Sequence, residues 1–334
     1  MKHPIPAAMF AALLLPMTVR LPACAAEVQQ KASPAVQVIT LGTAGGPRVR
    51  LKRSEPSTAL RVGDAVYLID AGDRVLQQLE AARINQAQVR AVFITHYHLD
   101  HTAGLMPMLG IRWMRDVSTP LKLIGPPGLK AVTAGFDAAM APTLAIGNSA
   151  GNADPLKNVS MAEVPAGGLV FEDENIRVFA VENTHFHQVA EPSTHPKSYS
   201  YRVETSRGTV VFTGDTGPSD AVTRLAQGAD MLVSEVINAD VILDGARRTK
   251  DKMPAAAYER ARAHLMEDHL APEAVGQMAS KAGVHQVVLT HIGPGLDTET
   301  SEQADALYAA GVRKVFSGQV SVASDLQVFP LTKP

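Results

Sequence analysis

The stretch "FITHYHLDHTAG" occupies residues 93–104 and overlaps the end of the apolar run "VRAVFI" at residues 89–94. Three histidines and one aspartate fall within six positions, namely His96, His98, Asp100 and His101. A loop that leaves the end of a strand can project alternate side chains toward one point. Imidazole and carboxylate groups suit zinc and, less often, manganese or iron. The spacing therefore predicts a metal site at the end of a buried strand.

Three donor residues farther along the chain each follow an apolar run of their own. His185 comes after "VFAVEN", Asp215 lies in "FTGDT" after "VVF", and His291 lies in "LTHIGP" after "QVVLT". Taken alone, each is typical of a turn. Together with the first group they predict one rim at which several strand ends meet.

The chain of 334 residues contains a single cysteine, Cys24. It precedes or coincides with the cleavage point predicted below, so the mature chain has no thiol. Disulfides and thiolate ligands are thereby excluded, and any metal site must use nitrogen and oxygen donors.

The N-terminal segment has the pattern of a secretory signal peptide. Lys2 opens a short positive region, an apolar run covers residues 7–19, and small residues near Ala25 or Ala26 suit cleavage. The run is too short to span a bilayer as a permanent helix. Because "LPAC" resembles a lipoprotein cleavage box only weakly, we expect a soluble periplasmic or secreted protein rather than a lipid-anchored one.

Strand and helix patterns alternate through the rest of the chain without a clear linker. A strand is expected at 35–42, a hairpin at 57–70, and further strands at 89–94, 285–293 and 312–316, among others. Residues 126–166 favour a helix followed by a long loop. We therefore expect a signal peptide over residues 1–26 and one domain over residues 27–334.

The order HxHxDH, then His, then GD, then His resembles that of the metallo-β-lactamase-fold superfamily, and is most similar to its ribonuclease Z and arylsulfatase-like branch. Further similar segments are "ITLGTAGGP", "YLIDAG", "VVFTGDTGPS", "VSEV" and "HLAPEAVGQMA". The resemblance covers essentially the whole mature chain. It implies an α/β (α+β) fold, a four-layer αββα sandwich.

The resemblance also implies two zinc ions, with manganese or iron as alternatives, that share a hydroxide. Its pattern assigns one zinc to His96, His98 and His185, the other to Asp100, His101 and His291, and the bridging position to Asp215. Asp100 would in addition orient the hydroxide.

Two more positions match the pattern of the ribonuclease Z-like branch. Glu235 in "SEVI" and His269 in "DHLAP" correspond to a pair that hands a proton to the leaving group, although Ser234 replaces a histidine of that pattern. The sequence alone is also consistent with residues that have no catalytic role, in which case Glu235 would be a solvated strand end and His269 the start of a helix.

Four histidines outside this set have weaker patterns, and His195 is one of the two that follow His185 within ten residues. His187 competes with His185 as a ligand, because spacing alone does not fix geometry. His264 and His285 are expected on a helix face and at a strand start, with no chemical role.

The formal net charge of −2 gives no support to a nucleic-acid partner. Residues 126–165, the expected place for an RNA-binding arm, are not basic, since they carry Lys130 and Lys157 against Asp137, Asp154 and Glu163. We therefore expect a hydrolase of small phosphodiesters or aryl sulfate esters with no nucleic-acid partner. A homodimer is left open.

Two other functions remain open at this stage. A lactonase or β-lactamase would use the same metals on a cyclic carbonyl, and a non-catalytic zinc-binding protein would keep the ligands alone. Residues 243–269 form either a lid whose arginines meet an anionic substrate or a solvated helix.

Overall fold

The computed structural model describes residues 35–332 apart from 149, 188–195, 248–253 and 295–300. The predicted signal peptide lies outside the described residues, together with Cys24 and its lipoprotein-like context, so these stay predictions. No helix of the described ranges is both long and apolar enough to cross a membrane.

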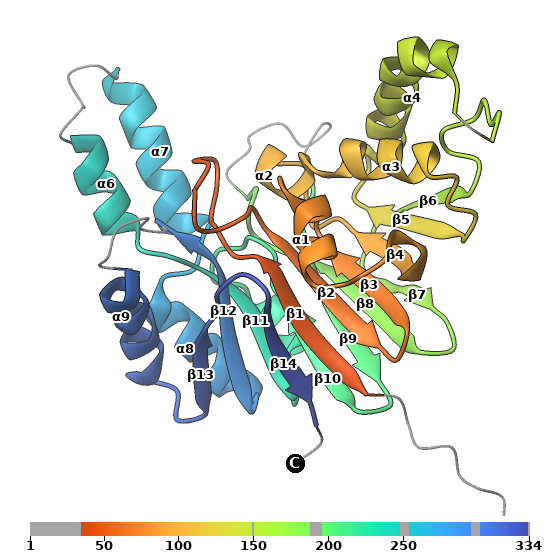
Figure 1. Ribbon diagram of the computed structural model, residues 1–334. Coiled ribbons are helices and arrows are strands. Elements are labelled where there is room, and N and C mark those ends of the chain that lie inside the picture. The colour runs from red at the N-terminus through yellow and green to blue at the C-terminus, as the bar shows by residue number, and fades with distance from the viewer. Residues whose placement is uncertain (1–34, 149, 188–195, 248–253, 295–300, 333–334) are drawn as a thin grey trace, which may run out of the picture. The chain divides into compact units, whose positions relative to one another are not determined.

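Fourteen strands of the described ranges form two seven-stranded sheets (Figure 1). The first has the order β14-β1-β2-β3-β4-β5-β6 and the second β13-β12-β11-β10-β9-β8-β7. The bounds are β1 Val36–Gly42, β2 Ser57–Val62, β3 Ala65–Ile69, β4 Val89–Phe93, β5 Leu121–Gly125, β6 Val159–Glu163, β7 Gly168–Glu172, β8 Ile176–Glu182, β9 Tyr199–Thr205, β10 Gly208–Phe212, β11 Met231–Ile237, β12 Gln286–Gly293, β13 Gln319–Val322 and β14 Gln327–Leu331.

Helices cover the outer face of each sheet. Their bounds are α1 Val75–Ala81, the 3₁₀ turn η1 Gln86–Gln88, α2 Leu99–Thr102, α3 Leu105–Met114, α4 Leu129–Ile146, α5 Asp220–Leu225, α6 Ala239–Arg247, α7 Ala255–Glu267, α8 Pro272–Ala282 and α9 Ser301–Arg313. Residues of α1, α3 and α4 pack with the first sheet in one apolar cluster, and residues of α5, α8 and α9 pack with the second sheet in another.

A third apolar cluster lies between the two sheets and joins them. Its largest side chains include Tyr67, Phe93, Tyr199 and Tyr201, all fully buried. Sheets covered on both faces explain the nearly continuous apolar runs of the central strands. The four-layer αββα sandwich implied by the resemblance is confirmed.

Three of the strands that precede or carry predicted donors, β4, β10 and β12, each pair in parallel with a neighbour, whereas β8, which precedes His185, is antiparallel to both of its neighbours. β4 pairs in parallel with β3 and β5, and β11 pairs in parallel with β10 and β12. Parallel neighbours bring their carboxyl ends to one edge of a sheet, where loops can gather functional groups.

Two local expectations are wrong. The strand expected at 312–316 begins inside α9, where Tyr308, Ala309 and Val312 are buried at helical spacing against the second sheet. The long loop expected after a helix in 126–166 contains β6, which pairs in parallel with β5. Half-buried edge strands give a weak sequence signal because only part of their pattern is apolar.

Candidate metal centre

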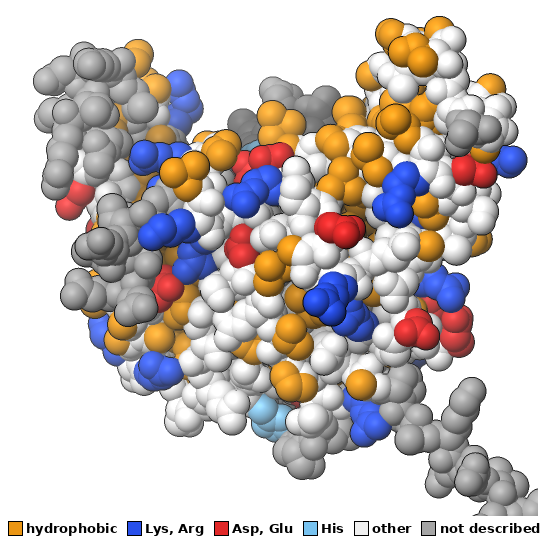
Figure 2. Space-filling view, viewed as in Figure 1, with side chains coloured by type: hydrophobic (Ala, Val, Ile, Leu, Met, Phe, Trp, Pro, Cys, Tyr) orange, Lys and Arg blue, Asp and Glu red, His pale blue; other side chains and the backbone are white. Residues whose placement is uncertain are grey.

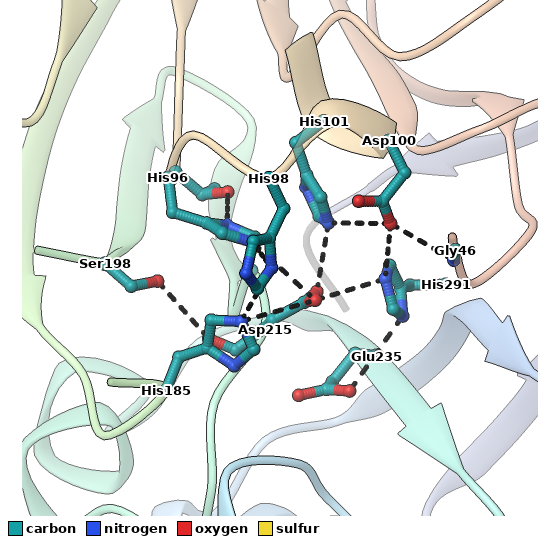
Figure 3. Close-up of polar contacts among 12 residues, drawn as sticks. Gly46, His96, His98, Asp100, His101, His185, Ser198, Asp215, Glu235 and His291 are labelled. Carbon is teal, nitrogen blue, oxygen red and sulfur yellow. Dashed lines mark hydrogen bonds and ion pairs between the residues drawn. The ribbon is translucent and has the colours of Figure 1, made fainter. Parts of the chain in front are cut away.

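Three imidazole nitrogens meet at the carboxyl end of β4 (Figure 3). The Nδ1 atom of His98 lies 3.0 Å from His96 Nε2 and 3.2 Å from His185 Nε2. His96 and His185 are fully buried, and His98 is half-buried. Residues 87 positions apart along the chain therefore present three nitrogen donors to one point.

Hydrogen bonds to the second ring nitrogen fix the orientation of two of these histidines. His185 Nδ1 lies 3.0 Å from the main-chain oxygen of Asp268, and His96 Nδ1 lies 3.0 Å from Thr95 Oγ1. An Nδ1–H that donates to the Asp268 carbonyl leaves Nε2 of His185 as a lone-pair donor. Such partners behind a histidine are typical of metal ligands.

A second group of donors adjoins the first. Asp100 and His101 lie on α2, and Asp100 Oδ2 is 3.6 Å from His101 Nε2 and 3.4 Å from His291 Nε2. All three side chains are buried. This group therefore combines two residues of α2 with one residue of β12 in the second sheet.

Asp215 lies between the two groups (Figure 3). Its Oδ1 is 3.3 Å from His101 Nε2, and its Oδ2 is 3.2 Å from His291 Nε2 and 3.9 Å from both His96 Nε2 and His185 Nε2. The residue directly follows Gly214, whose positive φ of 58° turns the chain sharply after β10. That turn presents the carboxylate to both groups.

His291 reaches the site through a β-bulge. Glu235 pairs with Thr290 and Val236 with Ile292, so His291 is the extra residue of β12, and its φ is 44°. A bulge bends a strand and re-aims one side chain. The strand predicted from "HQVVLTHIG" is confirmed, but the bulge that places His291 outside the regular ladder was not predicted.

Asp70 fixes the ring of His101 and was not recognised as a site residue from the sequence. Its Oδ2 lies 2.8 Å from His101 Nδ1, and Asp70 also accepts hydrogen bonds from Thr95 N and Oγ1 at 2.8 and 2.9 Å. Asp70 is buried with a φ of 60°, a conformation uncommon outside glycine. Its place in "YLIDAG", directly after an apolar strand, is the signal that could have revealed it.

Gly46 makes room for Asp100. Its main-chain nitrogen donates to Asp100 Oδ2 at 3.1 Å, and a Cβ at this position would lie 2.2 Å from that same oxygen. Any other residue would push the carboxylate away from His101 and His291. The glycine turn in "GTAGG" is thus part of the site.

The donor set fits metal cations. Among the residues that the structure describes, His101 Nε2, His291 Nε2 and Asp215 Oδ1 are buried without a hydrogen-bond partner. Unpartnered buried polar atoms are costly, and a cation between them would satisfy them. His96, His98, His185 and Asp215 could hold one ion, and Asp100, His101 and His291 could hold another.

The electrostatics of the two groups differ. Burial lowers the pKa of His185 to about 3 and the pKa of His96 well below its usual range. Burial also opposes a charge on His291, but the Asp215 and Asp100 carboxylates outweigh it and raise the pKa of His291 to about 10. The first group thus presents uncharged imidazoles, and the second carries paired charges.

Glu235 and His269 form a buried pair next to Asp215. His269 Nδ1 lies 2.7 Å from Glu235 Oε2, and Thr216 N donates to Glu235 Oε1 at 2.6 Å. Burial raises the pKa of the Glu235 carboxyl well above its usual value and lowers the pKa of His269 to about 4. Glu235 is therefore not a solvated strand end, and His269 lies between α7 and α8 rather than at a helix start.

His187 lies outside the cluster of donors. Its side chain is 45% exposed, and its Nδ1 is 2.7 Å from Asp268 Oδ1. His285, also outside, is exposed and faces Asp230 at 3.5 Å. His264, for which no role was expected, borders the cavity next to the donors.

That cavity has a volume of 660 Å³ and opens beside both donor groups. Its lining combines polar groups, including Asp100, Asp215 and His291, with apolar ones such as Val49 and Leu99. It is large enough for part of a polymeric substrate.

Comparisons with known proteins show the family to which the chain belongs. A family model described as a beta-lactamase superfamily domain matches residues 66–292. Ribonuclease Z of Mycolicibacterium gilvum is 32% identical over 305 residues, 88% of this chain and 97% of that protein. The short form of human tRNase Z has a TM-score of 0.63 at 20% identity and covers 89% of this chain and 100% of its own. The metallo-beta-lactamase fold protein YhfI from Bacillus subtilis has a TM-score of 0.61 at 20% identity, covering 89% and 99%.

The chain therefore belongs to the metallo-β-lactamase superfamily. It is a hydrolase related to ribonuclease Z, as the resemblance implied. The expectation of a small-molecule ester substrate without a nucleic-acid partner is wrong, because the curated relatives are ribonucleases. The prediction was drawn from the net charge of the whole chain, which does not show where basic side chains lie on the surface.

Proposed function

We propose that this protein is a phosphodiesterase that hydrolyses RNA with two divalent cations, preferably zinc. The observation that carries the proposal is the pair of adjoining donor groups with the Asp215 carboxylate between them. The Glu235–His269 pair next to them adds a route for the proton that the leaving group needs.

The spacing of the donors suits zinc. Ligands around a tetrahedral zinc ion bound through nitrogen are separated by about 3.3 Å, since each bond is about 2.05 Å long. The three nitrogens of His96, His98 and His185 show edges of 3.0 and 3.2 Å. The edges among Asp100, His101 and His291 are 3.6 and 3.4 Å.

Bound cations would supply Lewis-acid polarisation of the phosphate and a lower pKa for water. The chain's own residues do the rest. Asp100, held by the Gly46 amide, orients the attacking water, whose oxygen forms the new bond to phosphorus. As the bond from phosphorus to the leaving oxygen breaks, His269 gives that oxygen a proton. The Glu235 carboxyl, whose pKa burial raises, donates to His269 Nδ1, so the uncharged ring carries on Nε2 the proton that it gives to the leaving oxygen, and the Glu235 proton passes to Nδ1.

RNA as the substrate is supported by the ribonuclease relatives and by the segment between β1 and β2. Pro47 and Val49 line the cavity, and the basic residues Arg48 and Lys52 on the same segment are exposed. In Figure 2, blue basic and orange apolar side chains occur close together over this part of the surface. Basic groups beside the cavity can hold backbone phosphates, and the apolar ones can meet bases.

Replacing Arg48 and Lys52 together with alanine is expected to weaken RNA binding without changing the cleavage rate at saturation. The logarithm of the affinity falls linearly with the logarithm of the salt concentration. Each lost phosphate contact reduces the steepness of this fall by about 1, so the double variant should show a slope that is shallower by about 2. Fluorescence anisotropy over a salt series measures the slope. Lys130→Ala on α4 is the matched control, and an unchanged slope in the double variant would place the RNA elsewhere.

Removal of metal is expected to lower the melting temperature. Zinc at a free concentration of one hundred times its Kd should stabilise the folded chain by about 2.7 kcal/mol, because it binds only the assembled donors. Thermal unfolding of chelator-treated protein, with zinc added back, measures this. Calcium prefers oxygen ligands and serves as the control. Equal stabilisation by both ions would contradict a site built mainly of imidazoles.

The function itself is tested with the zinc-loaded protein and a fluorescein-labelled single-stranded uridine 12-mer. A lactone and a cephalosporin serve as counter-substrates, because the superfamily metals suit cyclic carbonyls too. Cleavage of the oligonucleotide is expected. Rapid ring opening of a counter-substrate with an intact oligonucleotide would replace this function with that of a lactonase or β-lactamase.

Export to the periplasm or medium belongs to the same proposal and rests on residues 1–26 alone. Its test is the N-terminal sequence of protein recovered from a secreting host. A new terminus near Ala25 or Ala26 is expected, and retention of Met1 in the soluble intracellular fraction would refute export.

A further inference from the structure

The imidazole of His264 lies at the rim of the cavity without a role in the mechanism above. His264 is near the C-terminal end of α7 and lines the same cavity as His98 and His269. The centre of its ring is 4.9 Å from that of His269 and 6.1 Å from that of His98. It therefore lies beside the group that protonates the leaving oxygen.

A buried carboxylate fixes the orientation of this ring. His264 Nδ1 lies 2.9 Å from Asp268 Oδ2, and the side chain of Asp268 is 5% exposed. In the tautomer whose Nδ1–H donates to this carboxylate, the free lone pair of the ring lies on Nε2. That edge of the ring is left for the cavity, and the side chain is 40% exposed there.

A lone pair at this place suits a hydroxyl group better than a phosphate oxygen. Phosphate oxygens accept hydrogen bonds and would face another acceptor. A hydroxyl donates, and a ribose carries one on the carbon next to the 3′ oxygen. The 2′-hydroxyl is also what distinguishes RNA from DNA at a given position.

We infer that His264 accepts a hydrogen bond from the ribose 2′-hydroxyl at the cleaved linkage and thereby selects RNA over DNA. The inference rests on the proposed function and specifies its reaction. Water adds to phosphorus and releases one proton to solvent, the bond from phosphorus to the 3′ oxygen breaks, the proton of His269 goes to that oxygen, and solvent returns a proton to the Glu235–His269 pair. The products are a 3′-hydroxyl and a 5′-phosphate. Asp268 acts as a positioning residue through His264.

The test compares two labelled 12-mers, one of uridine and one of 2′-fluoro-2′-deoxyuridine, which cannot donate from the 2′ position. The wild type is expected to favour the ribose oligomer about fivefold, the value of one hydrogen bond. His264→Ala should lose this preference. Binding to chelator-treated protein, followed by anisotropy, gives a readout that does not depend on turnover.

His187→Ala is the matched control. His187 also contacts Asp268, at 2.7 Å from Oδ1, but does not line the cavity. This variant should keep the fivefold preference. His264→Gln retains an acceptor oxygen and should restore part of it, whereas Asp268→Asn should reduce it.

Each outcome separates this inference from the function on which it rests. If the wild type cleaves both oligomers equally, or if His264→Ala keeps the preference, the inference is overturned while the function stands. If neither oligomer is cleaved, both fail. Metal analysis must show the same content in His264→Ala as in the wild type. Loss of an ion would instead make His264 a ligand together with His185 and His269, whose donor atoms also lie close enough.

Discussion

Replacing Asp215 with alanine is expected to abolish RNA cleavage while the chain stays folded. Its carboxylate contacts four imidazoles, two from each donor group, at 3.2 to 3.9 Å. Without it, two cations in the proposed centre would lose the one carboxylate that lies between both donor groups. Lewis-acid stabilisation of several kcal/mol would be lost, a fall in kcat/KM of about 10³-fold or more.

The measurements are kcat/KM, metal content and circular dichroism. Metal content should fall below that of the wild type, and the far-ultraviolet spectrum should remain. Asp230→Ala is the matched control, because Asp230 accepts a hydrogen bond from Thr209 N at the opposite end of β10 from Asp215. An Asp215 variant with full activity and full metal content would remove the basis of the proposed centre.

His269→Ala is expected to reduce RNA cleavage by about 10²- to 10⁴-fold, the usual contribution of a general acid. The reason is that a ribose oxygen leaves poorly without a proton. A p-nitrophenyl phosphodiester, used as a probe, has a leaving group that needs no proton. Its hydrolysis should fall far less, and the ratio of the two rates measures the effect.

Glu235→Gln should show the same pattern with a smaller loss. The amide still occupies the place 2.7 Å from His269 Nδ1 and can donate to it, but unlike the carboxyl group it cannot pass a proton to the ring. Equal losses for both substrates in either variant would show that the pair supports the fold or the metals rather than the leaving group.

Much of the fold and the donor set could be predicted because both depend on short sequence patterns, namely apolar runs and the donor residues next to them. Apolar runs predicted the strands β4, β10 and β12, and a donor residue next to each run predicted the edge at which the metal site lies. The structure brings the predicted His185 into the cluster and leaves its rival His187 on Asp268. Sequence spacing could not decide between these two, because both follow the same strand within five residues.

What could not be predicted depends on contacts distant in sequence. The place of Asp70 after an apolar strand marks it as a candidate site residue, but its contact with His101 follows only from the packing of β3 against α2. His264 stands on a helix that buries no residue, so its pattern is that of a solvated face. The prediction of the partner class was wrong for a related reason, because a whole-chain charge of −2 does not show that the exposed Arg48 and Lys52 share a segment with Pro47 and Val49, which line the cavity.

The extra residue in β12 separates two kinds of damage that mutation can do. Deleting one position near His291 would let the ladder with β11 close in regular register, so the sheet could survive intact. The imidazole would then turn to the other face of the strand, away from Asp100 and Asp215. The deletion of one residue could thus leave a stably folded protein that lacks one of the proposed metal ligands and therefore the proposed activity.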